Sequence, residues 1–120
     1  MVAIKRVYEP ANSADGVRVL VDRVWPRGRT KNSLHIAQWM KDLAPSAELR
    51  RFFGHDPDRW QEFRKRYLQE LERPEIAPLL DQLIELACNA GLTMIYGAKD
   101  TERNQAAVLK EFIETHMRKA

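Results

Sequence analysis

Two stretches decide the fold: VRVLVDRVW at residues 17–25 and LTMIY at residues 92–96. Both are rich in Val, Ile, Leu and aromatic residues with little polar alternation, which is typical of strands covered on both faces. IKRVY at residues 4–8 is more polar and predicts a weaker strand nearer an edge of the sheet. Only eight residues separate it from the strand at 17–25, whereas a parallel crossover needs about a dozen. These two strands are therefore antiparallel neighbours, or parallel and not adjacent.

Apolar residues at helical spacing predict about five helices in the rest of the chain. We expect them at residues 36–43, 47–53, 57–73, 76–90 and from about residue 102 onward. Ser33 and Ser46 are the candidate N-caps of the first two helices, and Gly54 ends the second. The order of these elements predicts a single α/β domain over residues 1–120. Its small sheet, mostly parallel or mixed, is expected to have about three strands.

The composition fits one globular domain and excludes several other classes. The chain has 120 residues, of which 44% are hydrophobic and 31% are charged, so disordered, collagen-like and disulfide-stapled proteins are excluded. No apolar run approaches the roughly 20 residues of a membrane-spanning helix, and the N-terminal residues do not resemble a secretory signal. We therefore expect a cytoplasmic protein that does not bind a membrane.

Metal and thiol chemistry have little support in the sequence. The chain has one cysteine and three histidines, and the histidines lack the spacing of a zinc-binding helix. Cys88 lies in an apolar helical stretch and is expected to be a small core residue. We expect no metal site and no other cofactor.

The loops that follow the two strong strands are the candidate binding site. Ligands of open α/β sheets collect beyond the carboxyl ends of the strands. If the two strands are parallel, DRVWPRGR at residues 22–29 and YGAKDTERN at residues 96–104 meet there. Thirteen of the twenty cationic residues are arginines, whose planar guanidinium suits phosphate and carboxylate. Three of these arginines lie in the first loop, at Arg23, Arg27 and Arg29. They predict an anion grip with Trp25 as a stacking surface; alternatively, the loop is solvated and Trp25 packs into the core.

The second loop supplies further candidate ligands for the anion, namely Lys99, Asp100, Arg103 and Asn104. Gly97 permits a close approach of the backbone, and free N–H groups of the following helix can hold an anion. The alternative is a capped helix in which Asp100 or Thr101 is the N-cap and the basic residues are solvated.

His55 and Asp22 are the candidate catalytic residues. In GHDP at residues 54–57, the glycine ends one helix and the Asp-Pro pair begins the next, so only the histidine lacks a structural reason. A histidine in a loop can donate or accept a proton during catalysis, although it more often packs or forms hydrogen bonds. Asp22 is also a candidate for orienting the neighbouring cations.

The same blocks resemble the YeaO-like branch of the domain-of-unknown-function family 488 (DUF488). The resemblance rests on RVLVDRVWPRG, DLAPSAELRRFFGHDPDRWQEFRKRY and TMIYGAKDTERNQAAVL, which have the family's order and spacing and cover nearly the whole chain. It implies a small bacterial cytoplasmic α/β protein and does not imply a reaction. The positions that match the family pattern are Asp22, Arg23, Trp25, Pro26, Arg27, Gly28, Gly54, His55, Asp56, Pro57, Trp60, Asp100 and Asn104. Two positions depart from it: Gln105, where family members often have histidine, and Gly97, where alanine is frequent.

Three functions remain open at this point. The first is an anion-binding domain for a phosphorylated small molecule or nucleotide, with Arg23, Arg27 and Lys99 contacting the anion. The second is a nucleic-acid-binding or regulatory module, favoured by a pI near 9.2 and by three tryptophans. A net charge of only +3 speaks against it, and Trp39 and Trp60 lie on apolar helical stripes and are expected in the core. The third is a structural or interaction protein without catalytic activity, favoured if the arginines of the first loop are internally paired. The residues do not show whether the chain is an enzyme or what its oligomeric state is.

Overall fold

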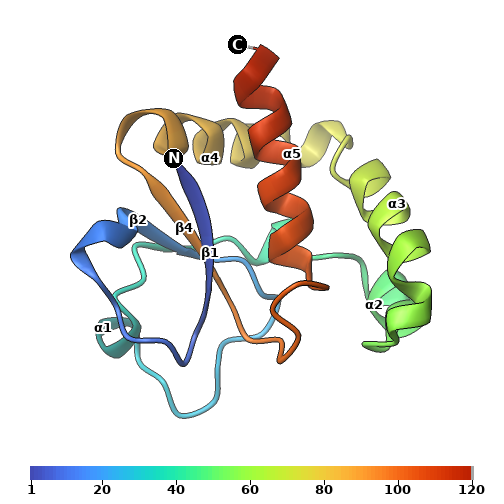
Figure 1. Cartoon of the computed structure of the whole chain (residues 1–120), viewed down its shortest axis with the longest axis horizontal. Helices are drawn as coiled ribbons and strands as arrows, with labels where there is room; N and C mark the ends of the chain where they lie inside the picture. The colour runs from blue at the N-terminus through green and yellow to red at the C-terminus, as the bar shows by residue number, and fades with distance from the viewer. Residues whose placement is uncertain (120) are drawn as a thin grey trace.

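The described residues form one sheet of four parallel strands in the order β1-β4-β2-β3. The strands are β1 (Val2–Arg6), β2 (Val17–Leu20), β3 (Gln38–Trp39) and β4 (Leu92–Tyr96). The computed structural model describes the backbone of residues 1–119 and the side chains of residues 1–117. It confirms the predicted α/β class and small parallel sheet, with one strand more than expected. β1 lies at an edge, parallel to β2 and separated from it by β4 (Figure 1).

The same part of the chain contains five α-helices: α1 (Lys31–Leu34), α2 (Ala47–Phe53), α3 (Trp60–Glu70), α4 (Ala77–Asn89) and α5 (Gln105–Lys119). Four 3-10 turns lie at Ser13–Asp15, Lys41–Leu43, Pro57–Arg59 and Pro74–Ile76. Ser46 caps α2 as predicted, because its hydroxyl accepts a hydrogen bond from the Leu49 N–H. Gly54 ends α2 in the left-handed conformation, with φ of 51°. Among these helices, none combines the length and the apolar character that crossing a membrane requires.

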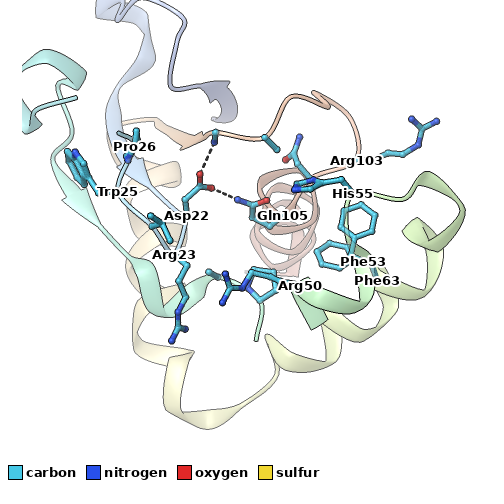
Figure 2. A pocket seen from close by; sticks show the side chains of 16 residues that line it. Asp22, Arg23, Trp25, Pro26, Arg50, Phe53, His55, Phe63, Arg103 and Gln105 are labelled. Atoms are coloured by element: carbon cyan, nitrogen blue, oxygen red, sulfur yellow. Dashed lines mark hydrogen bonds between the residues drawn. The ribbon is translucent and has the colours of Figure 1, made fainter. Parts of the chain in front are cut away.

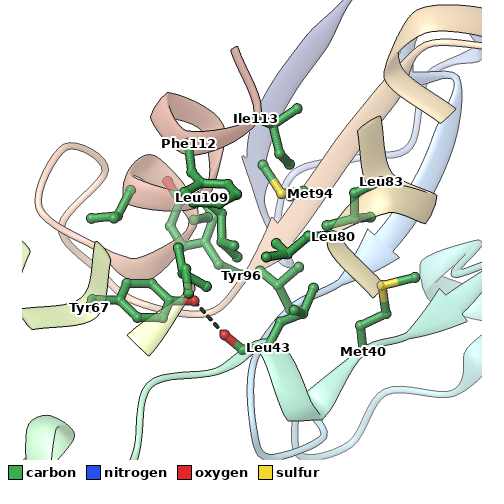
Figure 3. Packing of buried hydrophobic residues seen from close by; sticks show 14 of the residues in the cluster. Met40, Leu43, Tyr67, Leu80, Leu83, Met94, Tyr96, Leu109, Phe112 and Ile113 are labelled. Atoms are coloured by element: carbon green, nitrogen blue, oxygen red, sulfur yellow. Dashed lines mark hydrogen bonds between the residues drawn. The ribbon is translucent and has the colours of Figure 1, made fainter. Parts of the chain in front are cut away.

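The sheet separates a large hydrophobic core from a small one. Because side chains alternate across a strand, Val19 and Met94 point into the large core, which α3, α4 and α5 cover (Figure 3). Their neighbours Leu20 and Ile95 point to the opposite face. The small core there consists of Val7, Leu20, Leu34, Ile36 and Ile95. The helices are thus gathered mainly on one face, and α1 with its flanking loops covers the other.

The strand expected over residues 17–25 is shorter than predicted. β2 ends at Leu20, although the Val21 N–H still donates to the Ile95 carbonyl at 3.1 Å. The chain then leaves the sheet, because the Asp22 side chain bonds to the loop that follows β4. The apolar residues beyond this point serve the candidate site instead of the sheet.

The helix expected over residues 36–43 was wrong. That segment forms β3 and a 3-10 turn, because the N–H groups of Ala37 and Met40 donate to carbonyl groups of β2 at 2.8 and 2.9 Å. Pairing with the open edge of the sheet overrides the helical spacing of the apolar residues. The short helix α1 precedes this segment, and its N-cap is Thr30, with Ser33 as the third helical residue of a capping box.

Two further expectations need correction. Cys88 is exposed and not a core residue, since it follows Ala87, whose side chain occupies the buried stripe of α4. The last helix begins at Gln105 and not near residue 102. Its cap is Asn104, whose Oδ1 accepts from the Ala107 N–H at 2.9 Å.

Candidate functional site

A cavity of about 490 Å³ lies at the carboxyl edge of the sheet. It opens between the segment that follows β2, the turn at residues 44–45, the end of α2 and the loop that joins β4 to α5 (Figure 2). β2 and β4 are parallel, so the condition on which the sequence placed the two loops at one edge is met. The two candidate loops therefore meet at one cavity.

Asp22 joins the two loops and lines the cavity. Its Oδ2 accepts from the Gly97 N–H at 2.8 Å, and its Oδ1 accepts from the Gln105 Nε2. A Cβ on residue 97 would lie 3.0 Å from Oδ2, so glycine permits this close approach. Burial raises the pKa of the Asp22 carboxyl from 3.8 to about 6, and the two hydrogen bonds only partly offset that rise.

Three arginines from separate segments line the same cavity. Arg23 follows β2, Arg50 lies on α2, and Arg103 lies in the loop before α5. Within the described structure, Arg23 and Arg50 form no ion pair, and Arg103 has a loose pair with Asp100 at 3.4 Å. That pair is exposed and contributes little in water. The cavity thus has cations that are not neutralised from within the protein.

His55 lies at the cavity in an unfavourable backbone conformation. Its φ is 58°, directly after Gly54 at 51°, and a non-glycine residue in this left-handed region costs about 1 kcal/mol. Its ring lies 6.0 Å from that of Phe53. Its side chain forms no hydrogen bond to any described residue, so only packing holds the imidazole.

The structure brings together six of the ten residues expected at the site. The cavity is lined by Asp22, Arg23, Trp25, His55, Arg103 and Asn104. Asn104 is 1% exposed, and its side chain is used for the α5 cap and a bond to the Asp100 carbonyl.

Four expected residues do not line the cavity: Arg27, Arg29, Lys99 and Asp100. The turn at Gly28, with φ of 75°, carries the chain away, and the Arg29 guanidinium lies over the Tyr8 ring at 5.2 Å. The Asp100 carboxylate accepts from the N–H groups of Glu102 and Arg103. These two hydrogen bonds stabilise the turn, and they lower the pKa of the Asp100 carboxyl.

Sequence reasoning missed several residues that the cavity contains. Arg50, Phe53 and Phe63 come from helices that the strand-end argument does not reach. Arg50 and Phe53 are three residues apart on α2, so one helix face carries both. In the sequence, Gln105 was only a departure from the family pattern. Its hydrogen bond to Asp22 joins residues far apart in the chain and could not be predicted without the fold.

A parallel sheet with a cavity at its carboxyl edge places the chain among the open α/β domains. Within that class it belongs to the DUF488 family: a family model described as "Inactive DUF488-N3 subclade" matches residues 1–120. The chain is similar to "Uncharacterized protein YeaO" from Escherichia coli (strain K12), with 40% identity over 114 residues that cover 95% of this chain and 97% of that protein. It is also similar to "Uncharacterized protein Rv3073c" from Mycobacterium tuberculosis (strain ATCC 25618 / H37Rv), with 39% identity over 112 residues that cover 93% and 92%. No solved structure matches. The resemblance to the YeaO-like branch is confirmed.

Proposed function

We propose that the cavity binds a phosphorylated small molecule or nucleotide and that the protein binds it without catalysing a reaction. The presence of Arg23, Arg50 and Arg103 in the lining of one cavity carries this proposal. Guanidinium groups that lack carboxylate partners suit phosphate, because they donate paired hydrogen bonds in a fixed planar geometry. A cytoplasmic location is part of the proposal.

The size and walls of the cavity support a ligand larger than inorganic phosphate. A volume of about 490 Å³ falls in the range of small-molecule sites, about 300–1,000 Å³. The rings of Phe53 and Phe63 stack with centroids 4.3 Å apart and form an apolar wall. A nucleotide combines the matching parts, a phosphate for the arginines and a flat base for the aromatic wall.

Binding without chemistry is supported by the family and by the candidate catalytic residues. The matching subclade is described as inactive. Both carboxylate oxygens of Asp22 already accept hydrogen bonds, and no described side chain orients the His55 imidazole, whereas catalytic bases are normally oriented by a third group. We assign Asp22 to shaping the cavity and His55 to contacting the ligand.

The test is a titration of the isotopically labelled protein with sulfate and with AMP, followed by amide NMR. We expect the Gly97 and Ala98 resonances to shift. Arg23→Gln/Arg50→Gln should weaken binding at least tenfold, since each lost charge-assisted hydrogen bond costs about 1.5–3 kcal/mol. Arg27→Gln/Lys99→Gln removes the same charge outside the cavity and is the matched control. Unchanged binding in the cavity variant, or an equal loss in the control, removes the proposal.

A further inference from the structure

The positive excess of the chain is concentrated in one segment. Between Asp22 and Asp42 the sequence contains no acidic residue. The same segment carries five cations: Arg23, Arg27, Arg29, Lys31 and Lys41. The other fifteen cations of the chain are outnumbered by its seventeen acidic residues. The net charge of +3 therefore comes from this segment alone.

These five cations are exposed and unpaired within the described structure. Elsewhere in the described structure seven cations form ion pairs, such as Arg64 with Glu111 and Arg66 with Glu62, whereas others, such as Arg50 and Arg51, do not. The difference follows from the sequence, because α3 mixes both signs and the segment at 23–41 does not. Its charges are available to a partner outside the chain.

Exposed aromatic rings lie among these cations. Tyr8 is 56% exposed and Trp39 is 39% exposed, which corrects the expectation that Trp39 is a core residue. The guanidinium of Arg29 lies over the Tyr8 ring at 5.2 Å, and the ammonium of Lys41 lies over the Trp39 ring at 5.5 Å. Trp25 connects the two, since its Nε1 donates to the Arg29 carbonyl and its ring contacts Trp39 edge to face at 5.4 Å. These contacts join five residues into one surface, which we name the aromatic-cation surface: Tyr8, Arg29, Trp25, Trp39 and Lys41.

We propose that the aromatic-cation surface binds single-stranded nucleic acid. Unpaired cations attract the phosphate backbone of a strand, and exposed rings stack on bases that are free of a partner strand. A duplex hides its base faces, and an acidic peptide without aromatic residues, such as polyglutamate, has no flat rings to stack on the exposed side chains. The surface shares Trp25 with the lining of the cavity, but its cations Arg29 and Lys41 lie outside that lining, so the two sites can be tested separately.

Fluorescence anisotropy with a labelled oligothymidylate of about 15 nucleotides tests the proposal. With about four phosphates contacted, the logarithm of affinity should fall with the logarithm of salt at a slope near −3, or roughly 60-fold from 50 to 200 mM. Arg29→Gln/Lys41→Gln, which removes the cations that lie over Tyr8 and Trp39, should reduce that slope by about 1.4. The matched control is Arg51→Gln/Lys65→Gln, which removes two exposed cations from α2 and α3 and should leave the slope unchanged.

The stacking part of the proposal has its own readout. Trp39→Ala should weaken oligothymidylate binding about tenfold without changing the salt slope. Because the Trp39 Nε1 also donates to the Asp22 carbonyl, Trp39→Phe is the second variant; it loses this bond, keeps a ring and should bind nearly as the wild type does. Absence of binding at 50 mM salt overturns the proposal. So does equal affinity for the duplex or for polyglutamate, or an equal loss in the control. Sulfate shifts at Gly97 should persist in Arg29→Gln/Lys41→Gln, because both residues lie outside the cavity lining, which separates this outcome from a failure of the cavity.

Discussion

Two aspartates flank β2, and the pKa values of their carboxyl groups are shifted in opposite directions. Asp15, before the strand, is 8% exposed and pairs with Arg18 at 2.6 Å and Lys5 at 3.1 Å. Burial raises the pKa of this carboxyl, but hydrogen bonds from the Asn12 backbone, Lys5 and Arg18 outweigh it, so the pKa is lowered. Asp22, after the strand, has only neutral hydrogen-bond donors, and burial raises its pKa to about 6.

The comparison separates a structural end of the sheet from a candidate functional end. The Asp15 carboxylate has two cationic partners, Lys5 and Arg18, and the Thr93 hydroxyl also donates to the Asp15 backbone carbonyl. At the carboxyl edge a carboxylate lacks a cation while Arg23 and Arg50 lack carboxylates. Unpaired charges of either sign destabilise the protein without a ligand. A bound ligand can supply the missing partners, so such charges are typical of a binding site.

Asp15→Asn should have the largest effect on stability. It leaves the Arg18 guanidinium, whose side chain is 5% exposed, without its countercharge, and breaking a buried pair costs about 3–5 kcal/mol. Urea unfolding at pH 7 measures the loss. Glu62→Gln breaks the exposed pair with Arg66 and should cost less than about 1 kcal/mol. Equal losses in the two variants would show that the Asp15 cluster is no more than a surface pair.

Asp22→Asn should have the opposite sign and stabilise the protein by about 2 kcal/mol at pH 7. The folded pKa of Asp22, about 6, exceeds its ordinary value of 3.8, so the folded state binds more protons between these values. Stability from this group is therefore full below about pH 4, falls as the pH rises through 6, and is lost above it. About two pKa units bound the effect near 3 kcal/mol, and the amide cannot ionise.

The measurement is the difference in unfolding free energy between Asp22→Asn and the wild type from pH 4 to pH 8. Contributions of Asp15 are common to both proteins and cancel in this difference. We expect a difference near zero at pH 4 that grows up to about pH 6 and is constant above it. A flat difference would mean that Asp22 is not raised in the folded state. The chemical shift of the Asp22 carboxyl carbon, followed by NMR as a function of pH, measures the pKa of the folded state directly.

Much of this architecture could be predicted, because it depends on local patterns. The apolar run at 92–96 became β4 with the predicted bounds. The loops of Asp22 and Gly97 were expected to meet only if the two buried strands were parallel, and the structure supplies that direction. The helix over 36–43 failed because the open edge of β2 is a property of the fold and not of that segment.

The sequence indicated the cavity residues that follow the strands and did not indicate those that lie on helices. Residues that follow strands, such as Asp22 and Arg23, were found because strand ends determine where they lie. Arg50 is on a helix that packs across the cavity, and nothing local distinguishes it from the solvated Arg51. Arg27 and Arg29 looked equivalent to Arg23 in sequence, but neither lines the cavity, and after the turn at Gly28 the Arg29 guanidinium lies over the Tyr8 ring.

His55→Gly should stabilise the protein by about 0.5–1 kcal/mol. Glycine adopts the left-handed conformation of residue 55 without strain, which outweighs its larger entropy in the unfolded chain. His35 has a similar φ of 54° at the end of α1, outside the cavity, so His35→Gly is the matched control for stability. Urea unfolding should show a gain in both variants, while sulfate binding should weaken only in His55→Gly. Equal sulfate affinity in the two variants would mean that the His55 side chain does not contact the ligand and that its strained backbone has no role in binding.

The smallest effect expected is the pH dependence of sulfate binding in the cavity. Sulfate keeps its charge between pH 5 and pH 7.5, whereas Asp22 gains a proton as the pH falls through about 6. Removing a like charge from the lining should tighten binding about threefold at pH 5, a difference of about 0.7 kcal/mol. Asp22→Asn should bind with the tighter affinity at both pH values, because its side chain is always neutral. Since the imidazole of His55 also lines the cavity, the comparison is repeated in His55→Gln. If the pH dependence survives in Asp22→Asn and is lost in His55→Gln, the histidine and not the aspartate controls the charge of the site.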